Sequence, residues 1–273
     1  MKPAHRPLIA ALLLAASLAQ AQPQPHPMPQ PAPAPMATAA PPAPVAAPAS
    51  PAPPAAPALP VEPGRVYAPG PFDRVELAGA ARVTLVQGDK DQVFVAGDAD
   101  VQRDIDVQLN DRQLVIRPSG GWKFWSSNRV NVFIEMRQLN QLTLSGASDL
   151  LAPGPLNLDR LRLFISGAGQ VRLEQLQARE LVFVISGSGD GQLAGQVNNV
   201  VLQISGKGKV VADRLQTKRA RVNVSGLGNV VLWATDELQA HISGVGSIDY
   251  FGQPQVQRSL AGMGTITARG DRR

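Results

Sequence analysis

The chain has 273 residues, a formal net charge of +5 and no cysteine, so disulfides and cysteine-ligated metal sites are excluded. Its basic residues are interspersed with acidic ones, whereas a nucleic-acid-binding domain concentrates them on one face, so no nucleic-acid partner is expected. The composition is also divided along the chain, because most of the proline lies in one N-terminal segment.

Residues 1–21 have the pattern of a secretory signal peptide. Lys2 and Arg6 precede an apolar run over 8–18, and a small-x-small cleavage motif follows at 19–21. The run is shorter than the ~20 apolar residues that a transmembrane helix needs. We expect an exported protein, periplasmic or on the cell surface, with no transmembrane segment in the mature chain. Removing these two cations from the total of +5 leaves +3.

Residues 22–70 are rich in Pro and Ala. Proline has no backbone N–H and biases the preceding residue toward extended conformations, so this segment is predicted to be a disordered tether without a core. The alternative is a specific proline-rich ligand. The tether would hold the folded domain, residues 71–269, away from the N-terminus, and residues 270–273 would form a short tail.

The first part of the domain, residues 72–139, is expected to consist of β-hairpins. Residues 72–98 alternate apolar and polar positions, with a turn at 88–91 between two predicted strands. A second hairpin is predicted over 105–117, around a turn at Asn110-Asp111. No stretch with helical periodicity is found.

The segment 119–128 is unusual because it combines glycine and serine with Trp122, Phe124 and Trp125. Aromatic side chains can stack on sugars or anchor a protein partner. They can equally cover the open end of a β-sheet fold, whose edge would otherwise pair with another chain. We favour the cap.

From residue 140 onward a four-residue SG-x-G phrase occurs seven times, and its serines are 18 to 21 residues apart. The copies at 145–148 and 261–264 are degenerate. A fixed period of this length is typical of a solenoid, in which each repeat is one coil. The phrase is interpreted as a structural corner. The predicted corner residues are Ser145, Gly146, Ser166, Gly167, Gly169, Ser186, Gly187, Gly189, Ser205, Gly206, Gly208, Ser225, Gly226, Gly228, Ser243, Gly244, Gly246, Gly262 and Gly264.

Aliphatic residues recur one and three positions before the serine and five and seven positions after it, with a further Leu or Val about ten positions after it. Each coil is therefore predicted to contain a strand, the corner, a second strand and a looser third side. Glycine suits the corner because it permits positive φ or close backbone approach, and the serine hydroxyl can bond to local backbone. The predicted fold is all-β, a right-handed parallel β-helix-like solenoid of about seven coils of 18–21 residues, preceded by β-hairpins.

The block FDRVELAGAARVTLVQGDKDQVFV at 72–95, followed by repeats of the form L-x-I-S-G-x-G-x-V, resembles the DUF2807 family of adhesin-like head GIN domains. The resemblance covers about residues 70–269. It implies the right-handed parallel β-helix-like fold and a bacterial envelope protein. It carries over no catalytic residue, because the family has none assigned.

Few residues offer catalytic chemistry. His241 is the one histidine in the predicted domain, and it should face outward two residues before Ser243 without an orienting acid. Asp149 and Asp190 occupy the position four residues after the serine, two levels apart, which is in the range of the carboxylate pair of an inverting glycosidase. Outward acids are more often solubility devices, and Asp89 and Asp91 read as a turn rather than a calcium loop.

We therefore predict a non-catalytic, exported binding or scaffolding module of the bacterial cell envelope, adhesin-like, with an envelope protein or glycan as partner. No catalytic residue, cofactor or metal is expected. One alternative is a β-helix enzyme that cleaves polysaccharide with surface carboxylates. Another is a structural protein that self-associates through the solenoid ends, near Met263 to Arg269.

Overall fold

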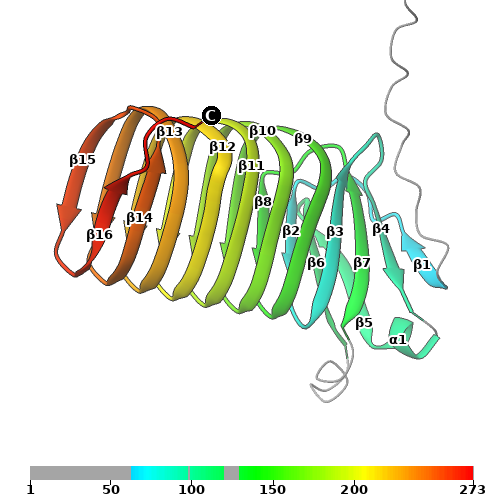
Figure 1. Cartoon of the computed structure of the whole chain (residues 1–273). Coiled ribbons are helices and arrows are strands. Elements are labelled where there is room, and N and C mark those ends of the chain that lie inside the picture. Colours follow the sequence, from blue (N-terminus) through cyan, green and yellow to red (C-terminus); the bar gives the residue numbers. More distant parts are fainter. Residues whose placement is uncertain (1–62, 98, 120–128, 273) are drawn as a thin grey trace, which may run out of the picture. The chain divides into compact units, whose positions relative to one another are not determined.

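The computed structural model describes residues 63–97, 99–119 and 129–272. The fold is nearly all-β, as predicted, with one short helix, α1 (Ala99–Arg103). The strands, shown in Figure 1, are β1 (Gly64–Tyr67), β2 (Arg74–Leu77), β3 (Ala81–Gln87), β4 (Gln92–Ala96), β5 (Ile105–Asn110), β6 (Gln113–Pro118), β7 (Val130–Met136), β8 (Gln141–Leu144), β9 (Ala147–Ile165), β10 (Ala168–Ile185), β11 (Ser188–Ile204), β12 (Lys207–Val224), β13 (Leu227–Ile242), β14 (Val245–Phe251), β15 (Gln255–Leu260) and β16 (Met263–Ala268).

The C-terminal two thirds of the described chain form a parallel β-solenoid. Each of β9 to β13 is one long strand that travels around the whole coil and pairs in parallel with the coils before and after it. The predicted third side is part of this ladder rather than a loose connection, and small register shifts mark where each coil bends there. The solenoid has about six turns, slightly fewer than the predicted seven.

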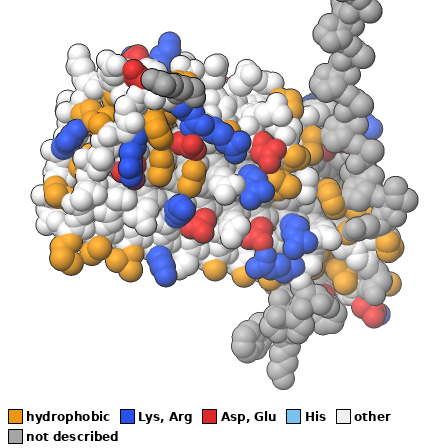
Figure 2. Space-filling view, in the orientation of Figure 1, with side chains coloured by type: hydrophobic (Ala, Val, Ile, Leu, Met, Phe, Trp, Pro, Cys, Tyr) orange, Lys and Arg blue, Asp and Glu red, His pale blue; other side chains and the backbone are white. Residues whose placement is uncertain are grey.

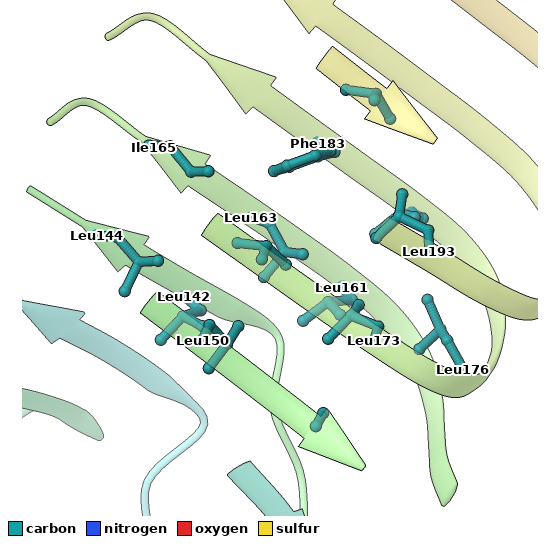
Figure 3. Packing of buried hydrophobic residues seen from close by; sticks show 14 of the residues in the cluster. Leu142, Leu144, Leu150, Leu161, Leu163, Ile165, Leu173, Leu176, Phe183 and Leu193 are labelled. Atoms are coloured by element: carbon teal, nitrogen blue, oxygen red, sulfur yellow. The ribbon is translucent and has the colours of Figure 1, made fainter. Parts of the chain in front are cut away.

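The core consists of aliphatic columns that run along the solenoid, as the repeat alignment predicted. Figure 3 shows side chains from successive coils meeting in the interior between the opposite faces. The column that precedes each corner is buried throughout the middle of the solenoid, and Leu176 and Leu215 of the third side are buried as well. This preceding column comprises Ile116, Leu77, Leu144, Ile165, Ile185, Ile204, Val224, Ile242 and Leu260.

One exception in the sequence pattern is compensated within the core. Gly191 stands where the other coils carry an aliphatic residue, while Phe183 stands where most carry leucine or valine. A Cβ placed on Gly191 would lie 2.4 Å from the Phe183 ring, which is itself 1% exposed. The larger ring therefore fills the space that the glycine leaves, and the packing density of the core is kept.

The corner glycines are required by close approach between coils and not by positive φ. From Gly146 onward, the described glycines of the phrase have no positive φ. A Cβ on Gly167, Gly187 or Gly206 would lie 1.9–2.0 Å from the carbonyl oxygen of the corresponding glycine in the preceding coil. These carbonyls accept hydrogen bonds across the corner, as in the 2.9 Å bond from Lys207 N to Gly187 O.

The N-terminal part differs from the predicted hairpins. Only β5 and β6 form the predicted antiparallel hairpin. β3 and β4 do not pair with each other, because β7 lies between them, and β2 and β3 instead extend the solenoid in parallel with β8 and β9. The hairpin interpretation of residues 72–98 was wrong because alternation reveals a half-buried strand but not its partner.

An eighth corner joins β2 to β3 and was missed in the sequence. Residues 78–81 read AGAA, with Gly79 at the position of the first glycine in the phrase. A Cβ on Gly146 would lie 1.9 Å from Gly79 O, and Ser145 N donates to Leu77 O at 2.9 Å. Unlike the later glycines, Gly79 has a positive φ of 106°.

The parallel solenoid is closed on its N-terminal side by antiparallel strands. β6 and β7 lie outside β2 and β3, and beyond them β4 pairs antiparallel with β7 and β1 antiparallel with β4. β1 falls within the range assigned to the tether, so the first strand precedes the expected domain start at residue 71. α1 was not predicted, and the predicted cap residues Trp122, Phe124 and Trp125 lie outside the described residues.

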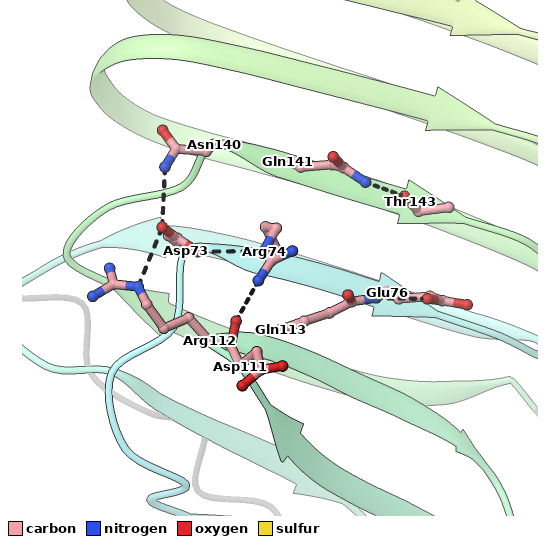
Figure 4. A network of polar contacts seen from close by, with 9 residues as sticks. All are labelled: Asp73, Arg74, Glu76, Asp111, Arg112, Gln113, Asn140, Gln141 and Thr143. Atoms are coloured by element: carbon pink, nitrogen blue, oxygen red, sulfur yellow. Dashed lines mark hydrogen bonds and ion pairs between the residues drawn. The ribbon is translucent and has the colours of Figure 1, made fainter.

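A polar network ties together the starts of three neighbouring strands (Figure 4). Asp73 accepts hydrogen bonds from Asn140 Nδ2 at 3.2 Å and from Arg112 Nε at 3.3 Å through the same carboxylate oxygen. Its backbone carbonyl accepts from Asn140 N at 2.7 Å. Asp73 thereby links β2 to the β5–β6 turn on one side and to β8 on the other.

We predict that Gly206→Ala destabilises the domain by about 3 kcal/mol, because the new Cβ must displace backbone in the preceding coil. Gly154→Ala is the matched control, since nothing lies within 4 Å of a Cβ built there. Its unfolding free energy should change by no more than about 1 kcal/mol. Denaturant unfolding of both variants measures the difference, and equal effects would contradict close approach as the reason for the corner glycine.

Candidate functional site

Among the described residues, a groove of about 610 Å³ follows the corner across six successive levels. The corners that it follows lie along the lower edge of the solenoid in Figure 1, as at the turn between β15 and β16. Its lining comes from the second, third and fourth positions after each corner serine, together with Arg129. These residues are Ala147, Asp149, Ala168, Gly169, Gln170, Ser188, Gly189, Asp190, Lys207, Gly208, Lys209, Leu227, Gly228, Asn229, Val245 and Gly246.

The floor of the groove is the second glycine of each phrase. A Cβ on Gly169 would lie 2.0 Å from Ser148 O, and one on Gly246 would lie 1.7 Å from Gly228 O. A Cβ on Gly189 or Gly208 would also come within 3.2 Å of the core side chain of Ile165 or Ile185, so this position faces inward. The floor of the groove is therefore backbone that lies between two rows of outward side chains.

One wall of the groove is a ladder of polar side chains. Register places Asp149, Gln170, Asp190, Lys209 and Asn229 directly above one another on successive coils. Adjacent levels are about 4.8 Å apart. A ligand lying along the groove would therefore meet a hydrogen-bonding group at every level.

The opposite wall changes character along the solenoid. It begins with small residues, passes Lys207, and ends with Leu227 and Val245, which are 54% and 42% exposed. Met263, which is 73% exposed, continues this row on the next coil. Figure 2 shows hydrophobic side chains gathered along the lower edge toward the β14–β16 end. The groove is thus acidic at one end, basic in the middle and apolar at the other end.

The two predicted carboxylates lie on the same wall, separated by Gln170, as the register predicted. Both are engaged with the scaffold. Asp149 forms an ion pair with Arg129 and accepts from Gln170 N at 3.3 Å. Asp190 accepts from Lys209 N at 3.0 Å. These contacts give each carboxylate a role in joining its coil to the next one.

The other residues that the sequence analysis considered for catalysis belong to the scaffold of the solenoid. The hydroxyls of four corner serines donate to a carbonyl of the preceding coil rather than to local backbone as expected. These are Ser145, Ser166, Ser186 and Ser225, and the bond from Ser186 Oγ to Ile165 O is 3.3 Å long. His241 is half-buried on the outer surface of β13, next to the fully buried Ile242. The described residues contain no cluster of three or more His, Asp or Glu suited to a metal ion.

Asp91 is occupied by an ion pair at the turn that follows β3. Its carboxylate accepts from Arg137 N at 3.0 Å and from Arg137 Nε at 2.8 Å. The hydrogen bond and the charge of Asp91 raise the pKa of the Arg137 guanidinium. The side chain thus fastens the turn to the end of β7, which agrees with its interpretation as a turn residue.

Sequence reasoning found the corner but missed most of the groove. Arg129, Lys207, Lys209 and Leu227 received no functional role. The signal was present, because aligning the second position after each serine reveals the change from alanine through lysine to leucine and valine. Its meaning depends on knowing that these residues border a common hollow.

The sequence profile of the family described as "Putative auto-transporter adhesin, head GIN domain" (DUF2807) matches residues 71–254. The chain belongs to this family. The resemblance read from the SG-x-G repeats is confirmed. Among curated proteins, none matches the chain.

Solved structures share the fold. A "putative adhesin" from Bacteroides fragilis NCTC 9343 has a TM-score of 0.69 at 24% identity, covering 75% of this chain and 95% of its own. A "putative lipid binding protein" from Parabacteroides distasonis ATCC 8503 has a TM-score of 0.62 at 21% identity, covering 76% and 96%. A "putative adhesin" from Parabacteroides merdae ATCC 43184 has a TM-score of 0.58 at 19% identity, covering 76% and 95%. At these identities the likeness establishes the fold alone.

Within the part of the chain that the structure describes, no helix has the length and apolar character needed to cross a membrane.

We predict that Asp190→Ala lowers stability by about 1 kcal/mol, because Lys209 N loses its carboxylate acceptor. Asp190→Asn retains an acceptor oxygen at the same place and should recover most of that loss. Thermal and denaturant unfolding of the pair test this scaffold role. If Asn were as destabilising as Ala, the carboxylate charge rather than the inter-coil hydrogen bond would be the stabilising element.

Proposed function

We propose that this protein is an exported, non-catalytic binding module of the bacterial cell envelope, and that its ligand lies along the corner groove. The groove carries the proposal because it is long, open and continuous across six coils. An elongated hollow with repeated polar groups suits an extended polymer better than a compact metabolite, which is usually bound in an enclosed pocket. The predicted Pro/Ala tether would let the module reach such a ligand away from its attachment point.

The side chains of the groove favour an extended segment of an envelope protein as the ligand. Asp149 and Asp190 can pair with basic groups, Lys207 and Lys209 with acidic groups, and Leu227 with an apolar side chain. Aromatic side chains, on which sugars commonly stack, are lacking among the described residues that line the groove. A polypeptide presents all three kinds of partner group, whereas a neutral glycan presents only hydroxyls.

We predict that Lys207→Glu/Lys209→Glu weakens binding of the purified protein to bacterial envelope fractions by at least about tenfold, because two favourable charge contacts become repulsive. Lys218→Glu/Arg219→Glu is the matched control, since it makes the same charge change on exposed residues of the same coil outside the groove. Sedimentation binding measures both variants.

Envelope fractions treated beforehand with protease or with glycan hydrolases identify the ligand class. Loss of binding after protease treatment supports the proposed protein segment. Loss only after glycan hydrolysis would establish a glycan ligand instead. Equal binding by the groove variant and the wild type would reject the groove as the binding surface.

The enzymatic alternative has its own test. We predict that neither the purified protein nor its Asp149→Asn/Asp190→Asn variant releases reducing ends from envelope polysaccharides. Reducing-sugar assays and mass spectrometry of the products provide the measurements. Cleavage by the wild type that disappears in the double variant would overturn the non-catalytic proposal and restore the carboxylates as a general acid and base.

A further inference from the structure

The last coil of the solenoid has an open edge. β15 pairs only with β13 and β16 pairs chiefly with β14, and no described strand lies on the far side of either one. Figure 1 shows both strands at the end of the solenoid opposite β1. A β-edge of this kind presents unpaired backbone donors and acceptors that can template pairing with another chain.

The backbone groups that face outward can be assigned. Met263 N donates to Gly244 O at 2.9 Å and Arg269 N donates to Tyr250 O at 2.8 Å, so these residues face β14. Because alternate residues of a strand direct their N–H and C=O groups to opposite sides, Gly264, Ile266 and Ala268 direct theirs away from the solenoid. The outward edge of β16 is therefore available for a further strand.

The side chains of this edge leave it unprotected. Strand edges are usually guarded by lysine, other inward-pointing charges, proline or bulges. β16 reads MGTITA and carries none of these residue types, and β15 carries only Arg258. Leu260 is 52% exposed, although the residues before it in its column are at most 2% exposed. The core columns thus end at an exposed apolar surface.

We propose that this edge binds the same edge of a second copy of the chain, giving a closed tail-to-tail dimer. A two-fold axis places β16 antiparallel to its counterpart, and likewise β15, which is a permitted pairing that joins the two cores end to end. Like the contacts between coils within the solenoid, this contact joins backbone edge to backbone edge and aliphatic residue to aliphatic residue.

The chain itself argues against the other occupants of the edge. The opposite end carries the short antiparallel strand β1 at its margin, so the two ends do not match and head-to-tail stacking is disfavoured. The N-terminal segment 22–62 is rich in proline, which cannot donate to a β-ladder. A second identical edge supplies the missing donors and acceptors in full. Two grooves in one particle would also strengthen binding to a repetitive envelope surface through avidity.

Sedimentation equilibrium and light scattering of the wild-type chain over a range of concentrations test the proposal. We expect a species of twice the chain mass that does not grow further with concentration. Leu260→Lys should raise the dimer dissociation constant at least about tenfold, because it places an unpaired charge in the apolar contact. Ala268→Pro should do the same, because it removes only an outward-facing N–H. Val66→Lys is the matched control, since Val66 is 49% exposed on β1 at the other end, and it should leave the dimer intact.

Circular dichroism of each variant confirms that the fold is retained, and the two edge variants disturb the contact by different means. A wild-type chain that stays monomeric at its highest soluble concentration would overturn the proposal. So would a dimer that resists both edge variants. Dissociation by Val66→Lys, or particles that keep growing with concentration, would establish head-to-tail stacking instead.

Discussion

The structure depends on the close approach of backbone between successive coils at the corner. Each coil brings its first glycine to within van der Waals contact of the glycine carbonyl below it, leaving about 2 Å between that oxygen and any added Cβ. Such an approach excludes every side chain, so glycine repeats at the same place in each coil. With this distance fixed, the strands on either side of the corner are in register from coil to coil, and each core side chain packs against the equivalent side chain of the next coil.

The same corner also shapes the surface. The backbone of the second glycine of each phrase lies between two rows of outward side chains, and the groove follows this backbone across the solenoid. Residues beside the glycines do not contribute to the core, so their chemistry can vary from coil to coil. The change from acidic through basic to apolar side chains along the groove is therefore compatible with an unchanged core.

The ends of a solenoid pose a different problem from its middle. On the N-terminal side, β6 and β7 extend the parallel stack beside β2 and β3, and β4 and β1 then continue the sheet with antiparallel strands. On the C-terminal side, the parallel stack stops at β15 and β16, and residues of the tail return along the solenoid, where Arg272 pairs with Asp213 at 2.8 Å. The return of the tail leaves the last strands with a free edge, and this asymmetry underlies the proposed dimer.

The sequence alone determined the repeat, the corner and the core columns, because each coil repeats the same local solution and the period makes it visible. It also placed Asp149 and Asp190 on one wall, since register follows from the repeat. Only the tertiary structure decided where the non-repeating strands pair. Alternation in residues 72–98 predicts strands but does not specify their partners, and β7 lies between β3 and β4. Only the tertiary structure also shows why residue 206 must be glycine. The close approach of Gly206 to the carbonyl oxygen of Gly187 exists only between neighbouring coils and cannot be read from the sequence of one coil.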